Sequence, residues 1–323
     1  MQGLVTVVIP CFNYARYLEQ CVRSVVQQSH QRWECIIVDD GSTDDTPQVC
    51  ARLAATDSRI TFVRQTNRGL SAARNTGIRR ARGDFVQLLD ADDILEADKL
   101  KVQVEFLKTH PDTDIVLGEA AFFDANAPTH LRPRRRDGGI GTTRKVNGNG
   151  PAVLSALVSE NICVVHAALL RRTVFDAVGL FDEALHAHED WDFWLRCAVQ
   201  GQRFSYVATG ADRALVREHG TNMSWRRSLM FRTAISVRER VHLQLPDGLR
   251  MENARCVVEL KSCLGVELLR AGEWRAGWKL YAEASRSAQR SPKTRLRLIL
   301  LLPGAREAAR LSRKMFSSNA RRR

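Results

Sequence analysis

Apolar runs and amphipathic stretches alternate along residues 4–118. Each short run is rich in β-branched or aliphatic side chains, and a longer stretch with helical periodicity follows it. This alternation is typical of a mainly parallel sheet flanked by helices, so the sequence predicts an α/β fold. The predicted strands are Val5–Ile9, Cys35–Val38, Ile60–Val63, Phe85–Leu89 and Ile115–Leu117, and the predicted helices are Tyr17–Gln27, Pro47–Ala55, Leu70–Arg80 and Lys99–Lys108.

The remainder of the chain has a different pattern. Ala125–Gly150 is rich in Gly, Pro, Arg and Asn and has no periodicity, which predicts a loop that interrupts the sheet. From Leu229 onward helical periodicity dominates, and Leu264–Ala284 resembles one tetratricopeptide-like hairpin. Between these regions we expect a helix near Ala152–Val158, a strand near Val164–Leu170 and an acidic helix start at Glu189–Trp194.

Composition limits the class of protein. With 323 residues, 44% of them hydrophobic and 26% charged, the chain can bury a core in one or two folding units and is neither collagen-like nor disordered. The formal net charge of +13 comes from basic residues in Arg132–Arg136 and Arg295–Arg323. No basic motif with interleaved aromatic residues is present, so the sequence gives no support for nucleic acid as a partner.

Cysteine spacing and apolar run lengths indicate the compartment. The eight cysteines lie far apart, without a CxxC pair or Cys/His ligand spacing, and are expected to be free thiols. No leader signature and no apolar run of about 20 residues is visible, which predicts a cytoplasmic chain. The short apolar run Leu296–Leu302 precedes a basic stretch. This tail either lies on an anionic membrane, at its inner face, or packs on the rest of the chain.

Polar and aromatic residues follow the first two predicted strands. In such sheets ligands bind at the carboxyl ends of the strands. Phe12 follows the first strand and either stacks on a base or packs under the first helix. Asp39 and Asp40 follow the second strand, and a carboxylate there can accept the N3 hydrogen of uracil or a ribose hydroxyl. Helix capping by the following turn would leave these two carboxylates unused.

The next two motifs suit a diphosphate and a cation. Gly69 opens a predicted helix with Arg74 one turn inside, and helix N-termini and arginines both bind phosphate, although an ordinary helix start has the same pattern. Asp90, Asp92 and Asp93 directly follow an apolar strand. Their concentrated negative charge favours a divalent cation, Mn²⁺ or Mg²⁺, over a solvated acidic turn.

Two later residues are candidates for catalysis and metal binding. Asp190 lies at the start of the predicted helix in His188–Arg196 and is either a general base or a carboxylate that stabilises the helix N-terminus. His219 lies in Arg217–Ser224 and is either a metal ligand or a structural histidine.

Together and in this order, these motifs resemble the family 2 glycosyltransferases with the A-type fold, over residues 4–225. The resemblance implies a catalytic domain at 1–225, with a nucleotide-binding half near 1–120, an acceptor half near 150–225, and a helical region with a basic tail at 226–323. Asp190 would be the catalytic base, and Asp92 and His219 would bind the metal. The nucleotide-sugar-binding residues would be Pro10, Phe12, Asn13, Asp39, Asp40, Arg74, Asp90 and Ala91.

The implied reaction is a single displacement with inversion. Asp190 would deprotonate an acceptor hydroxyl while the cation and Arg74 stabilise the departing diphosphate. The donor would be a nucleotide-sugar, with UDP as the expected nucleotide, and the acceptor a carbohydrate or a lipid-linked sugar of the bacterial surface. A nucleotidyltransferase would need a glycine-rich basic loop where Cys11–Tyr14 stands. A non-catalytic sugar-nucleotide-binding protein should have lost Asp92 or Asp190, and both are present.

Overall fold

A computed structural model describes residues 3–133, 143–210, 212–220 and 226–287. The chain divides into two compact units. The first comprises Met1–Trp225 with Gln244–Pro246, and the second comprises Arg226–Leu243 with Asp247–Arg323. The basic tail and most of Arg132–Arg136 therefore lie outside the described residues. None of the described helices is long and apolar enough to cross a bilayer.

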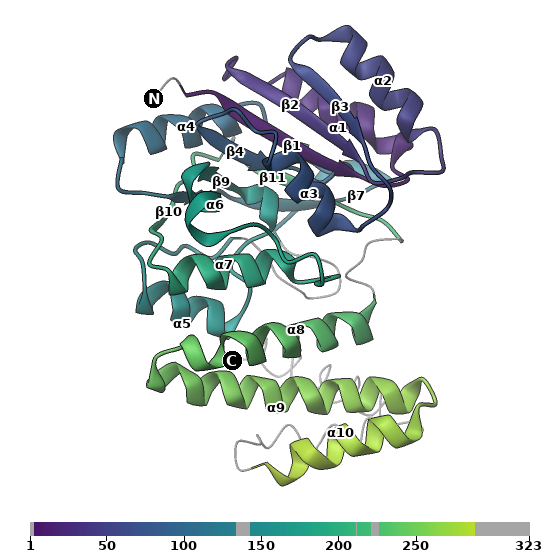
Figure 1. The fold of residues 1–323 in the computed structure, drawn as a ribbon, viewed down its shortest axis with the longest axis vertical. Helices are drawn as coiled ribbons and strands as arrows, with labels where there is room; N and C mark the ends of the chain where they lie inside the picture. Colours follow the sequence, from purple (N-terminus) through teal and green to yellow (C-terminus); the bar gives the residue numbers. More distant parts are fainter. Residues whose placement is uncertain (1–2, 134–142, 211, 221–225, 288–323) are drawn as a thin grey trace, which may run out of the picture. The chain divides into compact units, whose positions relative to one another are not determined.

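A seven-stranded sheet forms the centre of the first unit, in the order β10-β6-β9-β4-β1-β2-β3 (Figure 1). Every residue of β1 and β2 is buried, which agrees with their nearly continuous apolar sequences. The pairs β1–β2, β2–β3, β1–β4 and β6–β10 are parallel, whereas β9 is antiparallel to both neighbours. The strands are β1 (Val5–Cys11), β2 (Trp33–Asp39), β3 (Ile60–Arg64), β4 (Phe85–Leu88), β6 (Ile115–Leu117), β9 (Ala168–Arg171) and β10 (Phe204–Tyr206).

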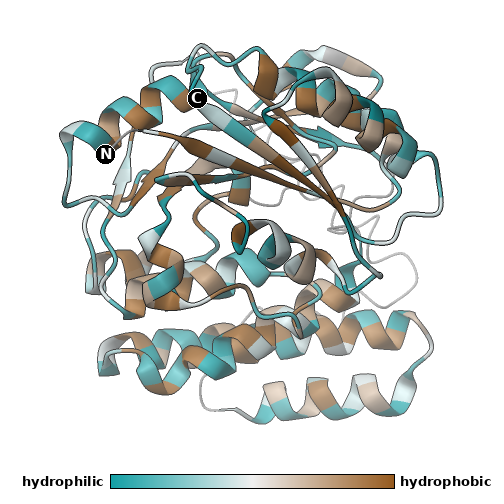
Figure 2. Ribbon diagram, turned by 45° about the horizontal axis from the view of Figure 1, so that its top comes forward, coloured by the Kyte–Doolittle hydropathy of each residue, from teal (hydrophilic) through white to brown (hydrophobic). Residues whose placement is uncertain are grey.

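Helices connect and cover these strands, as the alternating pattern predicts, so the predicted α/β class is confirmed. Figure 2 shows the apolar residues concentrated in the sheet and on one side of the helices. The helices of this unit are α1 (Ala15–Val26), α2 (Thr46–Thr56), α3 (Leu70–Ile78), α4 (Lys99–Thr109), α5 (Pro151–Ser159), α6 (Thr173–Val178) and α7 (Glu189–Val199), with a 3-10 turn, η1, at Val165–Ala167. The expected strand at Val164–Leu170 thus begins as this turn.

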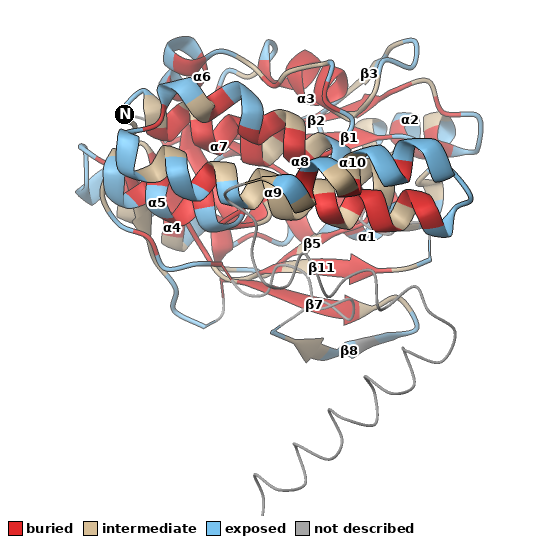
Figure 3. Ribbon diagram, turned by 90° about the horizontal axis from the view of Figure 1, so that it is seen from below, coloured by how far each residue is buried: buried red, intermediate tan, exposed pale blue. Residues whose placement is uncertain are grey.

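A second sheet of four strands was not expected from the sequence. Its order is β5-β11-β7-β8, with β5 at Ile94–Leu95, β7 at Ala120–Asp124, β8 at Ala127–Arg132 and β11 at Ala214–Glu218. The prediction of a loop throughout Ala125–Gly150 was wrong for β8, which pairs antiparallel with β7. Strand β11 pairs with β7 from far along the chain, a non-local contact that local periodicity does not reveal. Figure 3 colours β7 and β11 mostly as buried.

The second unit is helical over its described residues, as predicted. It contains α8 (Arg227–Val241), η3 (His242–Gln244, whose last residue belongs to the first unit), α9 (Asp247–Arg270) and α10 (Trp274–Arg286). Ile235, Leu264 and Leu268 form its apolar cluster. The expected hairpin joins α9 and α10 at two glycines: a Cβ on Gly265 would lie 2.9 Å from the Gly277 oxygen. Glycine at both positions therefore permits the backbones to approach closely.

A matched pair of glycine substitutions tests the packing of α3 on the sheet. Gly77 lies in α3, and a Cβ there would meet Val8 Cγ1 of β1 at 2.3 Å. We expect Gly77→Ala to destabilise the chain by about 1–3 kcal/mol, since overpacking a rigid core forces side chains or backbone to move. Gly248→Ala is the control, because a Cβ there meets nothing within 4 Å in α9. Urea unfolding measures both, and equal stability of Gly77→Ala and wild type would contradict this packing.

Candidate active site

The sequence-predicted residues converge at the carboxyl ends of β1, β2 and β4. These strands are neighbours and parallel, so the segments that follow them share one edge of the sheet. Asp39 ends β2, and the turn with Asp90 follows β4. Pro10 and Ala91 are buried, whereas Phe12 is 44% exposed, so of these three residues only Phe12 exposes its side chain to solvent. An exposed aromatic ring after β1 remains available for stacking.

Asp39 is buried with one oxygen left over. Its Oδ1 accepts a hydrogen bond from the Ser42 backbone N–H at 2.9 Å. Its Oδ2 accepts none from the described residues, although Arg64 Nε lies 3.3 Å away. A buried acceptor without a hydrogen bond is costly in a finished site, which favours a donor that arrives with a ligand.

Asn13 and Asp40 instead hold loops together. Asn13 has a φ of 58°, and its Oδ1 accepts hydrogen bonds from the backbone of Thr43 and, at 3.3 Å, of Asp44. Asp40 accepts from the N–H groups of Arg68 at 2.9 Å and Gly69 at 2.8 Å, at the start of α3. Both side chains thus shape the walls of the expected nucleotide site through the backbone.

Arg74 connects two segments of the first unit that are far apart in sequence. It projects from α3, is 1% exposed, and donates through Nη2 to Asp90 Oδ1 at 2.7 Å and through Nη1 to Glu189 Oε1. Burial would raise the pKa of Asp90, but the charge and hydrogen bond of Arg74, together with the charge of His166, lower it below its usual value. The guanidinium expected to face a diphosphate is therefore occupied by two carboxylates, which it holds in place.

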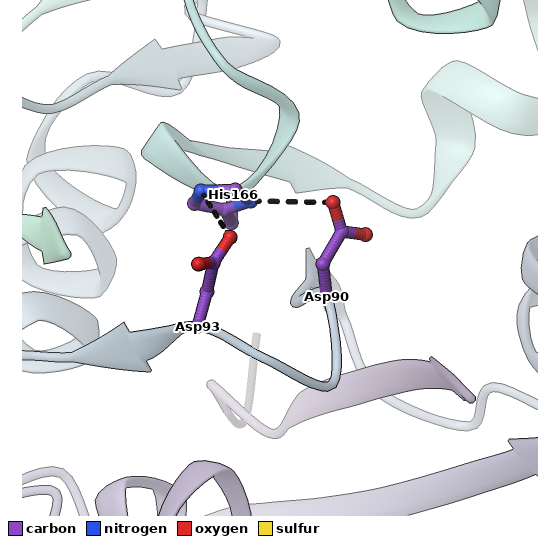
Figure 4. A group of neighbouring side chains, drawn as sticks. All are labelled: Asp90, Asp93 and His166. Carbon is purple, nitrogen blue, oxygen red and sulfur yellow. Dashed lines mark ion pairs between the residues drawn. The ribbon is translucent and has the colours of Figure 1, made fainter. Parts of the chain in front are cut away.

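Asp90 and Asp93 lie on either side of His166, which belongs to η1 (Figure 4). His166 Nδ1 is 3.9 Å from Asp90 Oδ2, and His166 Nε2 is 3.1 Å from Asp93 Oδ2. Burial lowers the pKa of His166 to about 4, and burial followed by the charges of Asp92 and Asp90 raises the pKa of Asp93. These three side chains are one group that can hold a cation.

Asp92 and His219 form a second group. Although they are distant in sequence, Asp92 Oδ2 lies 2.8 Å from His219 Nε2. His219 follows β11 directly, and the rings of Tyr14 and Tyr17 at the start of α1 surround its imidazole, with centroids 5.8 and 5.3 Å away. The structure thus brings together the two residues expected to bind the metal.

Arg217 fixes the acidic turn against β11. Its backbone N–H donates to Asp93 Oδ1 at 2.6 Å, and its Nε donates to the Asp92 carbonyl oxygen at 2.7 Å. The guanidinium lies 4.6 Å from the ring centroids of both Tyr17 and Phe123. A planar cation held between two rings has little freedom, so Arg217 sets the position of the turn relative to His219 two residues later.

Asp190 is buried at the first turn of α7. Its Oδ2 accepts a hydrogen bond from Asn161 Nδ2 at 3.0 Å, and its Oδ1 accepts one from the Trp191 N–H at 2.7 Å. Burial, and then the neighbouring charge of Glu189, raise its pKa to about 7, while Arg74 partly opposes the shift. A carboxylate with this pKa is near half-protonated at neutral pH, as general bases often are.

Several residues of this site were not identified from the sequence. Arg217 stood inside a recognised motif without an assigned role, whereas Asn161 and His166 belong to no motif. Lys99 is fully buried and donates to the Oε1 atoms of Gln87 and Gln103. The two amides in turn donate to the carbonyl oxygens of His166 at 3.0 Å and of Ala167 at 2.9 Å. This network supports η1 and thereby His166.

Comparison with known proteins places this geometry in a family. The chain is 45% identical over 105 residues to TuaG of Bacillus subtilis (strain 168), a glycosyltransferase assigned provisionally to teichuronic acid biosynthesis; the alignment covers 32% of this chain and 42% of TuaG. The chain spans between 17% and 42% of the length of several curated relatives that it matches.

Solved structures share the fold. One is S. aureus TarS 1–349 in complex with UDP, with a TM-score of 0.57 and 18% identity over 79% of this chain and 70% of that one. Another is the mannosyltransferase PcManGT from Pyrobaculum calidifontis in complex with GDP-Man and Mn²⁺, with a TM-score of 0.59 and 19% identity over 98% of this chain and 86% of that one. Residues 6–179, more than half of the chain, match the family described as Glycosyl transferase family 2, and the chain therefore belongs to that family.

Proposed function

We propose that this chain is an inverting glycosyltransferase that moves a sugar from a nucleotide-sugar to a hydroxyl of a glycan or a lipid-linked acceptor in bacterial surface polysaccharide synthesis. One observation underlies the proposal. The carboxylate of Asp190, whose pKa is raised to about 7, is next to Glu189 in the chain, and Arg74 links Glu189 to Asp90 of the acidic turn. Acceptor activation and donor binding would thus occur on the two sides of one buried ion-pair network.

UDP is the nucleotide that the site favours. Oδ2 of Asp39, which accepts no hydrogen bond from the described residues, can accept the N3–H of uracil, and the exposed ring of Phe12 can stack on a base. Two structural neighbours are complexes with nucleotides, UDP in one and GDP-Man in the other, which supports a nucleotide as the ligand. The Ser42 N–H occupies Oδ1 of Asp39, so one carboxylate oxygen is left for a base. One oxygen matches the single imide N–H of uracil, whereas guanine presents two adjacent N–H donors that would use both oxygens.

Asp92 and His219 fit a divalent cation. A carboxylate oxygen and an imidazole nitrogen 2.8 Å apart form a donor pair that Mn²⁺ accepts readily, and Mg²⁺ less so because of the nitrogen. The group at His166 fits less well. The two ring nitrogens of His166 face different carboxylates, and one ion can bind only one of these nitrogens. When bound, the cation neutralises charge on the diphosphate.

In the proposed reaction each protein group has one task. Asp190 accepts the proton of the acceptor hydroxyl, and Asn161 orients the Asp190 carboxylate by donating a hydrogen bond to its Oδ2. Glu189 keeps Asp190 basic and is itself held by Arg74. The hydroxyl oxygen then attacks the anomeric carbon as the bond to the diphosphate breaks, which inverts the configuration.

A donor screen tests the function as a whole. Nucleotide release is measured with UDP-, GDP- and dTDP-sugars, with and without candidate glycan or lipid-linked acceptors. We expect release from UDP-sugars to be fastest and to increase with acceptor. Release from none of these donors, under conditions in which the chain is folded, would contradict the assignment of a transferase.

Substitution of Asp190 tests the base. Asp190→Asn should lower kcat by about 10²- to 10⁴-fold with little change in UDP affinity, because the amide keeps the size but loses the basic oxygen. Asp192→Asn is the matched control: it removes a buried carboxylate of the same helix that pairs with Arg196. Turnover of Asp190→Asn close to wild type would assign the base to another residue.

The pH dependence provides a separate test of Asp190. The base acts when deprotonated, so kcat/KM should fall as the pH is lowered through about 7 and level off above it. Glu189 raises this pKa, so Glu189→Gln should move the acidic limb to lower pH. A limb that stays in place would show that Asp190 does not set the profile.

Binding of Mn²⁺ distinguishes the two candidate cation groups. Mn²⁺ is titrated in the presence of UDP, and the free ion is measured by electron paramagnetic resonance. Asp92→Asn and His219→Gln should each bind Mn²⁺ at least about 10-fold more weakly than wild type, because each variant loses a ligand. His166→Gln should retain wild-type affinity. The opposite order would assign the ion to Asp90, Asp93 and His166, and full transfer in excess chelator would exclude metal dependence.

A further inference from the structure

Helix α10 exposes two large aromatic side chains. Trp274 is 62% exposed and Trp278 is 50% exposed, whereas Trp33, Trp191 and Trp194 of the first unit are all at most 4% exposed. The core-facing side of α10 consists of other residues, Gly277, Tyr281 and Ala284, which are buried. The two tryptophans are therefore surplus to the core of the second unit.

The residues beside these tryptophans are basic. With 3.6 residues per turn, an arc of about 140° on α10 contains Trp274, Trp278, two small residues, and then Arg275, Lys279 and Arg286. The three basic side chains are exposed. Glu283, the acidic residue within α10, falls outside this arc, on the opposite side from Trp274. We call this arc the Trp-basic face.

We propose that the Trp-basic face binds an anionic lipid surface as a peripheral contact. Tryptophan rings favour the boundary between headgroups and acyl chains, because one part is apolar and the indole N–H is polar. Each Lys or Arg near anionic lipid contributes about 1 kcal/mol at modest salt. The face combines both components on one helix, and the sequence after Ser287 adds eleven Lys and Arg against one Glu.

Two other occupants fit less well. A second copy of the chain would bring two sets of three cations together, which is repulsive. A neutral glycan chain can stack on the tryptophans, but it offers no negative charge to the three cations of the arc. Lipid phosphates require only donors and positive charge, which Arg275, Lys279 and Arg286 supply. The inference is independent of the proposed reaction, because membrane binding can be measured without activity.

The test uses the full chain and vesicles of phosphatidylcholine with or without phosphatidylglycerol. Wild type should float with the anionic vesicles at low salt, and not with the neutral ones, and should lose binding at high salt. Acyl chains brominated near the headgroup should quench its tryptophan fluorescence. Trp274→Ala/Trp278→Ala should weaken partitioning at least 10-fold and abolish most of the quenching, with an unchanged melting temperature.

Leu243→Ala/Met251→Ala is the matched control, because it removes two other exposed apolar side chains, 79% and 57% exposed, outside α10. It should float like wild type. Three results would overturn the proposal: no flotation of wild type, equal flotation of the tryptophan variant, or a dimer in sedimentation velocity that the tryptophan substitutions dissociate. The second result would place membrane contact elsewhere in the chain, and the third would assign the face to a second copy.

Discussion

The two ion pairs of Arg74 are the interaction on which the site depends. Arg74 is buried in α3 and contacts Asp90 of the turn after β4 and Glu189 at the start of α7. Removal of the Arg74 guanidinium would leave the two carboxylates without their partner in a largely dry environment, which would lower the stability of the fold by about 3–5 kcal/mol. Because α3 and α7 are far apart in sequence, this one side chain joins the turn after β4 to two helices that only the tertiary fold brings together.

The buried groups around Arg74 have pKa values that are shifted in different directions. The pKa of Asp90 is lowered because Arg74 and His166 together outweigh burial, whereas burial raises the pKa of Asp190 to about 7 and also raises that of Asp93. Lys99 donates hydrogen bonds to two side-chain amides, and burial lowers its pKa to about 7. Carboxylates within one small region thus differ in proton affinity, because each has a different balance of burial and neighbouring charge.

The two units illustrate different relations between sequence pattern and structure. In the first unit, the parallel strands are buried and apolar, and the polar residues of the site lie in the segments that follow them. These motifs therefore meet at one edge of the sheet. In the second unit, α9 and α10 meet through Gly265 and Gly277, and the side chains left outside this contact, Trp274 and Trp278, are free for another role.

The sequence by itself determined the α/β class, most strands of the large sheet and the helical second unit, because these depend on local periodicity and on turn residues. It also indicated which carboxylates follow which strands, including Asp39 and Asp92. Tertiary structure alone decided the second sheet, since β7 and β11 pair across a long stretch of chain. It likewise decided that Arg74 faces carboxylates, that Asn161 and His166 belong to the site, and that Asp92 meets His219. Such contacts join residues distant in the chain, and the proton affinities that result depend on burial, which no local pattern encodes.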